Sequence, residues 1–165
     1  MGALARKPAV LLAMGSIWPG ASANGPVQSC LNLVEALASD YDFKIIARDR
    51  PFGPQAPPPS IEAGVWIDCG RFSAFYVRPE NLTPIYFHRV LAGIKHDLVH
   101  LNGFFDREFT IPILLARRLA GRSRRAGLLS PRGEFAPGAL QLKQFTKRLY
   151  LTGTRMCKLL DGIWL

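Results

Sequence analysis

The stretch Ser130-Pro-Arg-Gly-Glu-Phe-Ala-Pro-Gly138 contains the side chains best suited to binding an anion or a sugar. Arg132 could bind a phosphate or a carboxylate through two parallel hydrogen bonds, and Glu134 could accept hydrogen bonds from sugar hydroxyls. A simpler interpretation is that Arg132 and Glu134 pair with each other and order the turn. The residue types alone leave both interpretations open.

A second polar group interrupts the apolar segment Asp97-Leu-Val-His-Leu-Asn-Gly103. On a strand, His100 and Asn102 share one face because alternate side chains point the same way. A single histidine in such a segment is typically a hydrogen-bonded core residue. His96 and His100 have a spacing that suits a metal on a helix, but on a strand the same spacing does not bring the two rings together. We therefore expect no metal and no cofactor.

The loop from Gly15 to Gly25 precedes a segment with helical periodicity. Glycines let a backbone approach a phosphate closely, and a helix N-terminus supplies free amides and a partial positive charge. The loop lacks the dinucleotide fingerprint G-x-G-x-x-G. It is interpreted either as a phosphate or sugar-nucleotide contact or as a crossover loop that needs glycines for its turns.

The positive charge of the chain belongs to one third of it. Residues 1–106 carry 9 basic and 9 acidic side chains, whereas residues 107–158 carry 12 basic and 2 acidic ones, within an overall net charge of +9. A solvated helix face explains single charged side chains, but it does not explain such a large net positive charge in one segment. Anionic lipid headgroups attract such segments by about 1 kcal/mol per cation. Nucleic acid would do so too, but no recognised binding motif accompanies the charge, so we expect no nucleic-acid partner.

These polar segments must be positioned by alternating strands and helices. Short apolar runs typical of buried strands occur at residues 9–14, 43–47, 64–69, 97–101 and 127–130, and an aromatic extended segment at 71–77. Helical patterns occur at about residues 26–39, 82–94, 109–119 and 140–151. This alternation predicts an α/β, Rossmann-like, doubly wound parallel sheet with right-handed crossovers. Ligands of such sheets bind at the carboxyl ends of the strands, so the site is expected in the turns at residues 15–25, 48–53, 102–107 and 131–138.

Length and composition predict one folded domain over residues 1–165, with 48% apolar and 20% charged residues. The three cysteines are odd in number and far apart, which excludes a disulfide scaffold and favours a reducing compartment. Arg6 and Lys7 precede a short apolar run, as in a signal peptide, but cleavage would remove the predicted central strand. We expect a cytoplasmic protein that contacts the inner face of the plasma membrane peripherally through residues 117–158.

Three stretches resemble the N-terminal half of bacterial family-4 retaining glycosyltransferases, which have the GT-B fold. They are Asn24-Gly-Pro26 leading into Cys30-Leu-Asn-Leu-Val-Glu-Ala-Leu37, then Asp97-Leu-Val-His-Leu-Asn-Gly-Phe104, and finally Leu129-Ser-Pro-Arg-Gly-Glu-Phe-Ala-Pro-Gly-Ala-Leu140 with Lys147-Arg-Leu-Tyr150. The resemblance covers nearly the whole chain, and the Pro-Arg-Gly-Glu stretch is its most specific part.

The resemblance implies two Rossmann-like domains that transfer a sugar from a nucleotide-sugar donor to a polysaccharide or lipid-linked acceptor in the cleft between them. No metal is implied, because helix ends and basic side chains neutralise the leaving diphosphate. Asn24 and Gly25 would lie on the donor side. Asn102, Arg132 and Glu134 would lie near the acceptor or the sugar.

The chain departs from this family in two respects. Asn102 stands where many relatives have a histidine, so no catalytic residue is carried over and the catalytic groups are not assigned. The second, donor-binding domain with its pair of glutamates is absent from the 165 residues. We therefore expect little or no transferase activity from the isolated chain.

Two other functions compete with this one. The first is a non-catalytic α/β module that binds an anionic ligand or a membrane surface. The second is a domain that binds a nicotinamide dinucleotide, which Arg48-Asp49 at the end of the second predicted strand favours. The missing G-x-G-x-x-G weighs against the dinucleotide.

Overall fold

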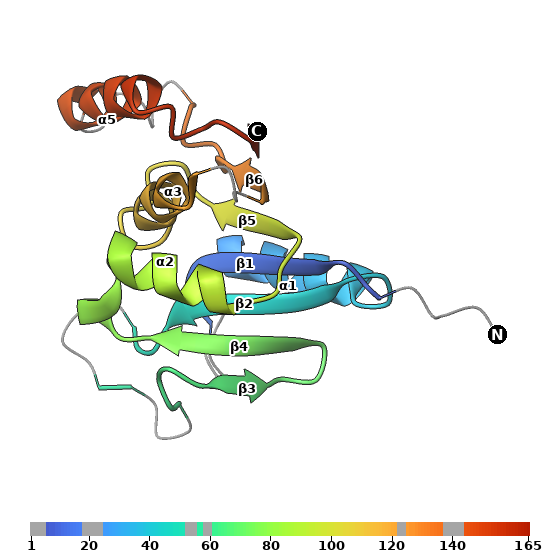
Figure 1. Cartoon of the computed structure of the whole chain (residues 1–165). Helices are drawn as coiled ribbons and strands as arrows, with labels where there is room; N and C mark the ends of the chain where they lie inside the picture. Colours follow the sequence, from blue (N-terminus) through green and yellow to red (C-terminus); the bar gives the residue numbers. More distant parts are fainter. Residues whose placement is uncertain (1–5, 18–24, 52–55, 58–60, 122–124, 137–143) are drawn as a thin grey trace.

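The computed structural model describes residues 6–17, 25–51, 56–57, 61–121, 125–136 and 144–165, and the statements below concern these residues. Seven strands form one sheet: β1 (Ala9–Ser16), β2 (Asp42–Arg48), β3 (Trp66–Asp68), β4 (Phe72–Val77), β5 (Leu98–Asn102), β6 (Ala126–Ser130) and β7 (Ile163–Trp164). The α-helices that accompany them are α1 (Gly25–Leu37), α2 (Pro84–Gly93), α3 (Thr110–Leu119) and α5 (Gln144–Met156), and a short 3₁₀ helix spans Pro79–Asn81 (Figure 1).

The strand order is β3-β4-β2-β1-β5-β6-β7, and all pairs except β3–β4 are parallel. The predicted α/β sheet of Rossmann-like type is confirmed at this level. The expectation of a parallel sheet throughout is wrong for β3. The chain reverses between β3 and β4 through Gly70, at φ 83°, whose amide donates to Asp68 Oδ1 over 2.8 Å. A turn this short can join only antiparallel strands.

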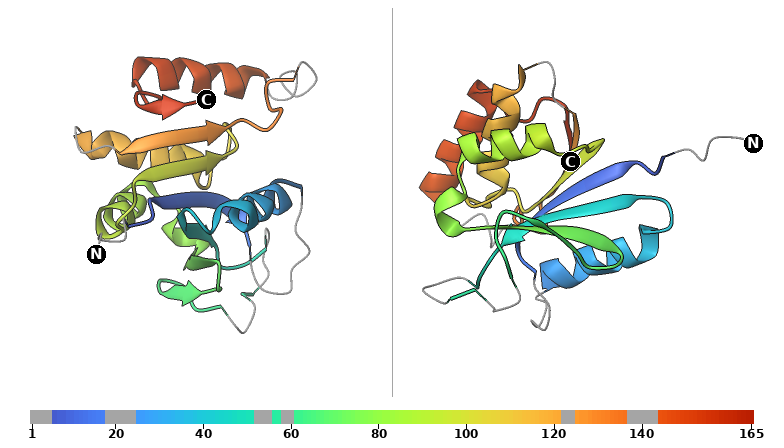
Figure 2. Two further views of the ribbon diagram at one scale, coloured as in Figure 1. Left: turned by 90° about the vertical axis from the view of Figure 1, so that its right-hand side faces the viewer. Right: turned by 60° about the horizontal axis from the view of Figure 1, so that its bottom comes forward.

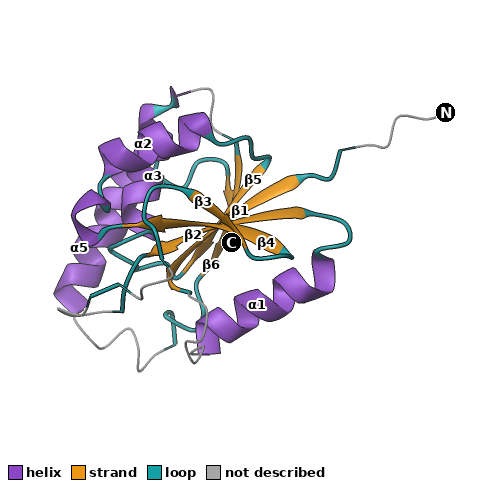
Figure 3. Ribbon diagram, turned by 90° about the horizontal axis from the view of Figure 1, so that it is seen from below, coloured by secondary structure: helices purple, strands orange, loops and turns teal. Residues whose placement is uncertain are grey.

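Helices cover both faces of the sheet (Figure 3). On one face, Leu12 and Met14 of β1 pack with Cys30 and Val34 of α1. On the other face, the alternate β1 residues pack against side chains from α2, α3 and the end of the chain. Because both faces of β1 are covered, its sequence is an uninterrupted apolar run.

The two halves of the sheet are wound in opposite directions from its centre. From β1 the chain passes through α1 to β2, and from β5 it passes through α3 to β6, with β1 and β5 adjacent. The carboxyl ends of β1 and β5 therefore form the topological switch point, where open α/β sheets bind ligands. Figure 2 shows α5 and β7 at the β6 side of the molecule.

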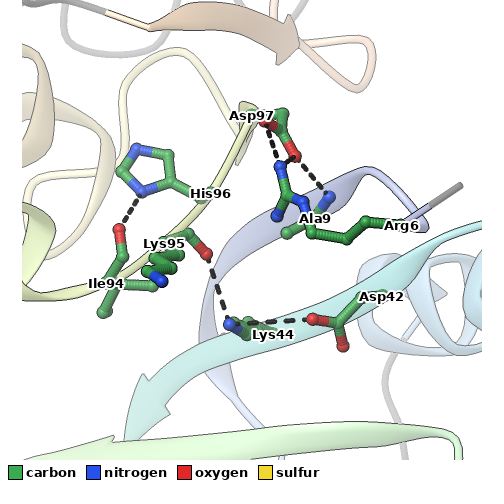
Figure 4. A network of polar contacts seen from close by, with 8 residues as sticks. All are labelled: Arg6, Ala9, Asp42, Lys44, Ile94, Lys95, His96 and Asp97. Atoms are coloured by element: carbon green, nitrogen blue, oxygen red, sulfur yellow. Dashed lines mark hydrogen bonds and ion pairs between the residues drawn. The ribbon is translucent and has the colours of Figure 1, made fainter. Parts of the chain in front are cut away.

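The opposite, amino-terminal edge of the sheet is fixed by Asp97 (Figure 4). Its Oδ2 accepts a hydrogen bond from the Ala9 amide at 2.8 Å, and Arg6 donates to both carboxylate oxygens at 2.9 Å. The bond from the Ala9 amide is the main reason that the pKa of Asp97 is lowered. This carboxylate thus holds the start of β5 against β1.

Among the described helices, none combines the length and the apolar composition needed to cross a membrane.

Candidate functional site

The candidate site lies at the carboxyl ends of β1, β5 and β6. Asn102 is the last residue of β5 and is paired in register with Ser130, the last residue of β6. The Gly103 amide then donates to the Ser130 carbonyl at 2.9 Å, so the two strands stay together as they leave the sheet. This pairing brings residues 97–103 and the described part of the second polar stretch, residues 130–136, to one edge.

Arg132 connects three elements at this edge. Its Nε donates to Asn102 Oδ1 at 2.5 Å, and Nη1 donates to Ser29 Oγ of α1 at 2.7 Å. Nη2 lies 3.3 Å from Cys30 Sγ. The backbone of Arg132 has φ 54°, a conformation that few residues other than glycine adopt. The side chain thus crosses from the β6 turn to the first turns of α1.

The charge of Arg132 meets only neutral partners in these contacts: an amide oxygen, a hydroxyl and a thiol. Among the described residues there is no ion pair between Arg132 and Glu134. The simpler interpretation of the turn, a mutual Arg132–Glu134 pair, is therefore wrong. An exposed guanidinium held in place by neutral groups keeps its full charge for an incoming anion.

Glu134 binds the backbone that follows β5. Its Oε2 accepts a hydrogen bond from the Phe104 amide and lies 3.4 Å from the Phe105 nitrogen. A Cβ added to Gly103, which has φ 103°, would lie 3.6 Å from Glu134 Oε1. The carboxylate thereby ties the turn after β6 to the loop after β5. The sequence pointed to Glu134 as a sugar ligand and did not indicate this backbone contact.

His100 lies beneath Arg132 in the core. Its side chain is buried, and Nε2 lies 2.8 Å from Ser130 Oγ. Burial, assisted by the charge of Arg132, lowers the pKa of His100 to about 4. The ring is neutral at neutral pH and hydrogen-bonded, which agrees with the expectation of a core histidine. Among the described residues, no group of three or more His, Cys, Asp or Glu side chains could hold a metal ion.

Ser29 and Cys30 are site residues that the sequence did not reveal. Both belong to α1, whose first residue is Gly25, and Cys30 is fully buried. Burial raises the pKa of the Cys30 thiol, while the nearby Arg132 guanidinium opposes that shift. The predicted donor-side residue Asn24 lies outside the described residues. Gly25 is exposed, and a Cβ added to it would meet no other described residue within 4 Å.

Asp106 organises the loop between β5 and α3. Its Oδ1 accepts hydrogen bonds from the Glu108 amide at 2.8 Å and the Phe109 amide at 3.2 Å. The Thr110 hydroxyl donates to the Gly103 carbonyl at 2.6 Å. Burial raises the pKa of Asp106. The loop that supports Asn102 is thus fixed at both ends by side-chain hydrogen bonds.

The carboxyl end of β2 is occupied by internal ion pairs. Arg48 Nη1 lies 2.8 and 3.1 Å from the two Glu108 carboxylate oxygens. The buried Asp49 carboxylate accepts two hydrogen bonds from Arg50, at 2.7 and 2.8 Å. In a dinucleotide-binding domain a carboxylate near this position binds the ribose hydroxyls. Because Arg50 already engages both oxygens of Asp49, the geometry weighs against the dinucleotide alternative.

The fold identifies the chain as a Rossmann-like α/β protein, with the exposed Arg132 at the switch point of its sheet. No protein-family model matches the chain, and the search of curated proteins found no match either.

Proposed function

We propose that this chain is the N-terminal, acceptor-side domain of a retaining glycosyltransferase of family 4, with the GT-B fold. The observation that carries the proposal is the placement of Arg132. Its guanidinium is exposed at the switch point and is held by Asn102, Ser29 and Cys30 without a carboxylate partner in those contacts. A diphosphate or a phosphorylated acceptor is an anion that such a group recognises through parallel hydrogen bonds.

The exposed first residue of α1, Gly25, supports the donor side of this proposal. Gly25 begins a helix of 13 residues at the same edge, and its N-terminal amides and dipole attract negative charge. A nucleotide sugar would then place its diphosphate near Gly25 and Asn24. Its sugar, or the acceptor, would lie nearer Asn102, Arg132 and Glu134. The second domain of such an enzyme would form the other wall of the cleft, so this chain alone would bind ligands weakly and transfer little or no sugar.

Calorimetric titration with pyrophosphate and a panel of nucleotide-diphosphate sugars tests the proposal. We expect Arg132→Gln to weaken binding about tenfold or more, because a charge-assisted hydrogen bond contributes roughly 1.5–3 kcal/mol. Arg155→Gln removes the same charge from an exposed position on α5 and serves as the control. Equal affinities in wild type and Arg132→Gln, or no binding of any panel member, would contradict the proposal.

A membrane surface is the partner that the basic third of the chain favours. Helix α5 carries Lys147, Arg148 and Arg155 and no acidic residue. Leu149 and Met156 on this helix are 64% and 79% exposed and lie seven residues apart, hence on one face. Basic helices with exposed apolar side chains bind in the headgroup region of anionic bilayers. We propose that this face contacts anionic lipid peripherally and brings the site to a lipid-linked acceptor.

Flotation with vesicles tests the membrane contact. We expect the chain to float with phosphatidylglycerol-containing vesicles and not with pure phosphatidylcholine. The double variant Leu149→Ser, Met156→Ser should lose most of this binding. Ile85→Ser, which changes a side chain that is 63% exposed on α2, is the matched control. Binding that ignores lipid charge, or that survives the double variant, would rule the contact out.

A further inference from the structure

A hollow lies at the edge of the sheet opposite the candidate site. Its volume is about 340 Å³, near the lower end of the range for small-molecule sites. It lies beside the last turns of α2 and α3, which lead into the amino-terminal ends of β5 and β6. The hollow is therefore independent of Arg132 and of the transferase proposal.

Among the described residues, the lining of this hollow is basic and apolar and includes no acidic side chain. Small and aliphatic residues of α2 and α3 form its walls, and the nitrogen-bearing side chains come from four positions. The lining includes Leu91, Ala120, His88, His96, Arg117 and Arg125. A concave site with apolar walls and a few convergent polar groups is the usual form of a small-ligand site.

His96 is a buried polar member of the lining. Its Nδ1 lies 2.8 Å from the Ile94 carbonyl, and since a carbonyl only accepts, Nδ1 carries the proton. Nε2 is then a hydrogen-bond acceptor, and Figure 4 shows it turned away from Ile94 and from the Asp97 network. Burial is the main cause of the lowered pKa of His96, and the charges of Arg125 and Arg117 lower it further. Both guanidinium groups therefore disfavour the protonated form of the His96 ring.

Arg117 is buried, with 4% of its surface exposed, whereas Arg125 is exposed. Arg117 Nη2 donates to the Arg125 carbonyl at 2.7 Å, which fixes the guanidinium beside the start of β6. Gly127 leaves room for the Arg117 guanidinium, because a Cβ at residue 127 would lie in tight contact with Arg117 Nη2, at 3.1 Å. The buried Arg117 guanidinium is therefore held at the backbone of Arg125, whose own side chain is exposed at the surface.

From this arrangement we propose that the hollow is a binding site for a small organic anion with a phosphate or carboxylate group. The oxyanion lies between Arg117 and Arg125, and the apolar part of the molecule packs on Leu91 and Ala120. His96 Nε2 accepts a hydrogen bond from a ligand hydroxyl, including the P–OH of a phosphate monoanion. The two guanidinium groups, with no carboxylate among the described lining residues, select against cationic ligands.

The three histidines of the chain allow the two sites to be observed separately. His88 and His96 line the hollow, whereas His100 lies beneath Arg132. Inorganic phosphate and butyrate are titrated into the full chain while the imidazole signals are followed by NMR. We expect saturable shifts of His88 and His96 with at least one probe. A phosphate site responds mainly to phosphate, and a carboxylate site mainly to butyrate.

Two variants and a matched control complete the test. Arg125→Gln should weaken binding about tenfold, and Ala120→Leu should weaken it too, because the larger side chain occupies the wall on which the apolar part of the ligand packs. Arg118→Gln removes an exposed charge from the last turn of α3 outside the lining and should leave affinity unchanged. No saturable shift of His88 or His96, or equal weakening by Arg118→Gln and Arg125→Gln, would overturn the proposal. Shifts confined to His100 would overturn it too, while supporting the site at Arg132.

Discussion

At the scale of single residues, Arg132 places an exposed positive charge at the candidate site. It contacts Asn102, Ser29 and Cys30, and its charge helps to lower the pKa of His100 beneath it. One of the two interpretations that the sequence left open paired this arginine with Glu134, which is only two residues away along the chain. The structure instead places Glu134 on backbone amides of the neighbouring loop.

The low pKa of His100 makes stability depend on pH. In the unfolded chain His100 has an ordinary pKa near 6.5, whereas in the folded chain its pKa is about 4. As the pH falls, the unfolded chain therefore binds this proton at a higher pH than the folded chain does. The free energy of unfolding should therefore fall as the pH drops from about 6.5 towards 4. The contribution of His100 is up to about 3 kcal/mol. Urea unfolding at pH 7 and pH 5 measures about 2 kcal/mol of this contribution, because pH 5 lies above the folded pKa.

The control for this prediction is His100→Gln, which lacks the titrating group. His96, with its lowered pKa, acts in the same direction, and Asp106, with its raised pKa, acts in the opposite one. Both remain in the variant, so the difference between the two proteins isolates His100. An identical pH dependence in wild type and His100→Gln would show that His100 does not titrate abnormally.

At the scale of elements, the loop between β5 and α3 is held by Glu134. Replacing Glu134 by Ala leaves the Phe104 and Phe105 amides without the oxygen that accepts from them. Hydrogen exchange of these two amides should accelerate, and the unfolding free energy should fall by about 1–3 kcal/mol. Glu134→Gln retains an acceptor oxygen and should protect them better than Ala. Unchanged exchange in Glu134→Ala would mean that the contact does not order the loop.

The same loop depends on the backbone conformation of Gly103. With φ 103°, it lies in a region that residues with a side chain rarely adopt, although an added Cβ would make only ordinary contacts. Gly103→Ala should therefore cost about 1–3 kcal/mol of stability from backbone strain. Gly93 ends α2 with open space around it and no positive φ, so Gly93→Ala should be neutral or stabilising. Thermal unfolding of the two variants gives the comparison, and equal midpoints would contradict it.

At the scale of the whole molecule, alternation of apolar runs and helical periodicity predicted the α/β sheet. Continuous apolar runs such as β1 appear because helices bury both faces of the sheet. The direction of β3 could not be predicted in the same way, since it depends on the short turn at Gly70. The predicted topology was enough to expect Asn102 and Arg132 at the same edge of the sheet. The contacts of Arg132 with Ser29 and Cys30 of α1 could not be predicted, because they join residues 102–103 positions apart in the sequence.

The central claim is that the carboxyl edge of the sheet binds a nucleotide sugar or a phosphorylated acceptor. A backbone amide shift map, recorded while nucleotide-diphosphate sugars and pyrophosphate are added, tests it most directly. We predict saturable shifts clustered at Gly25–Cys30, Asn102 and Arg132 and absent in Arg132→Gln. No saturable shifts at this edge, or shifts there that persist unchanged in Arg132→Gln, would contradict the account.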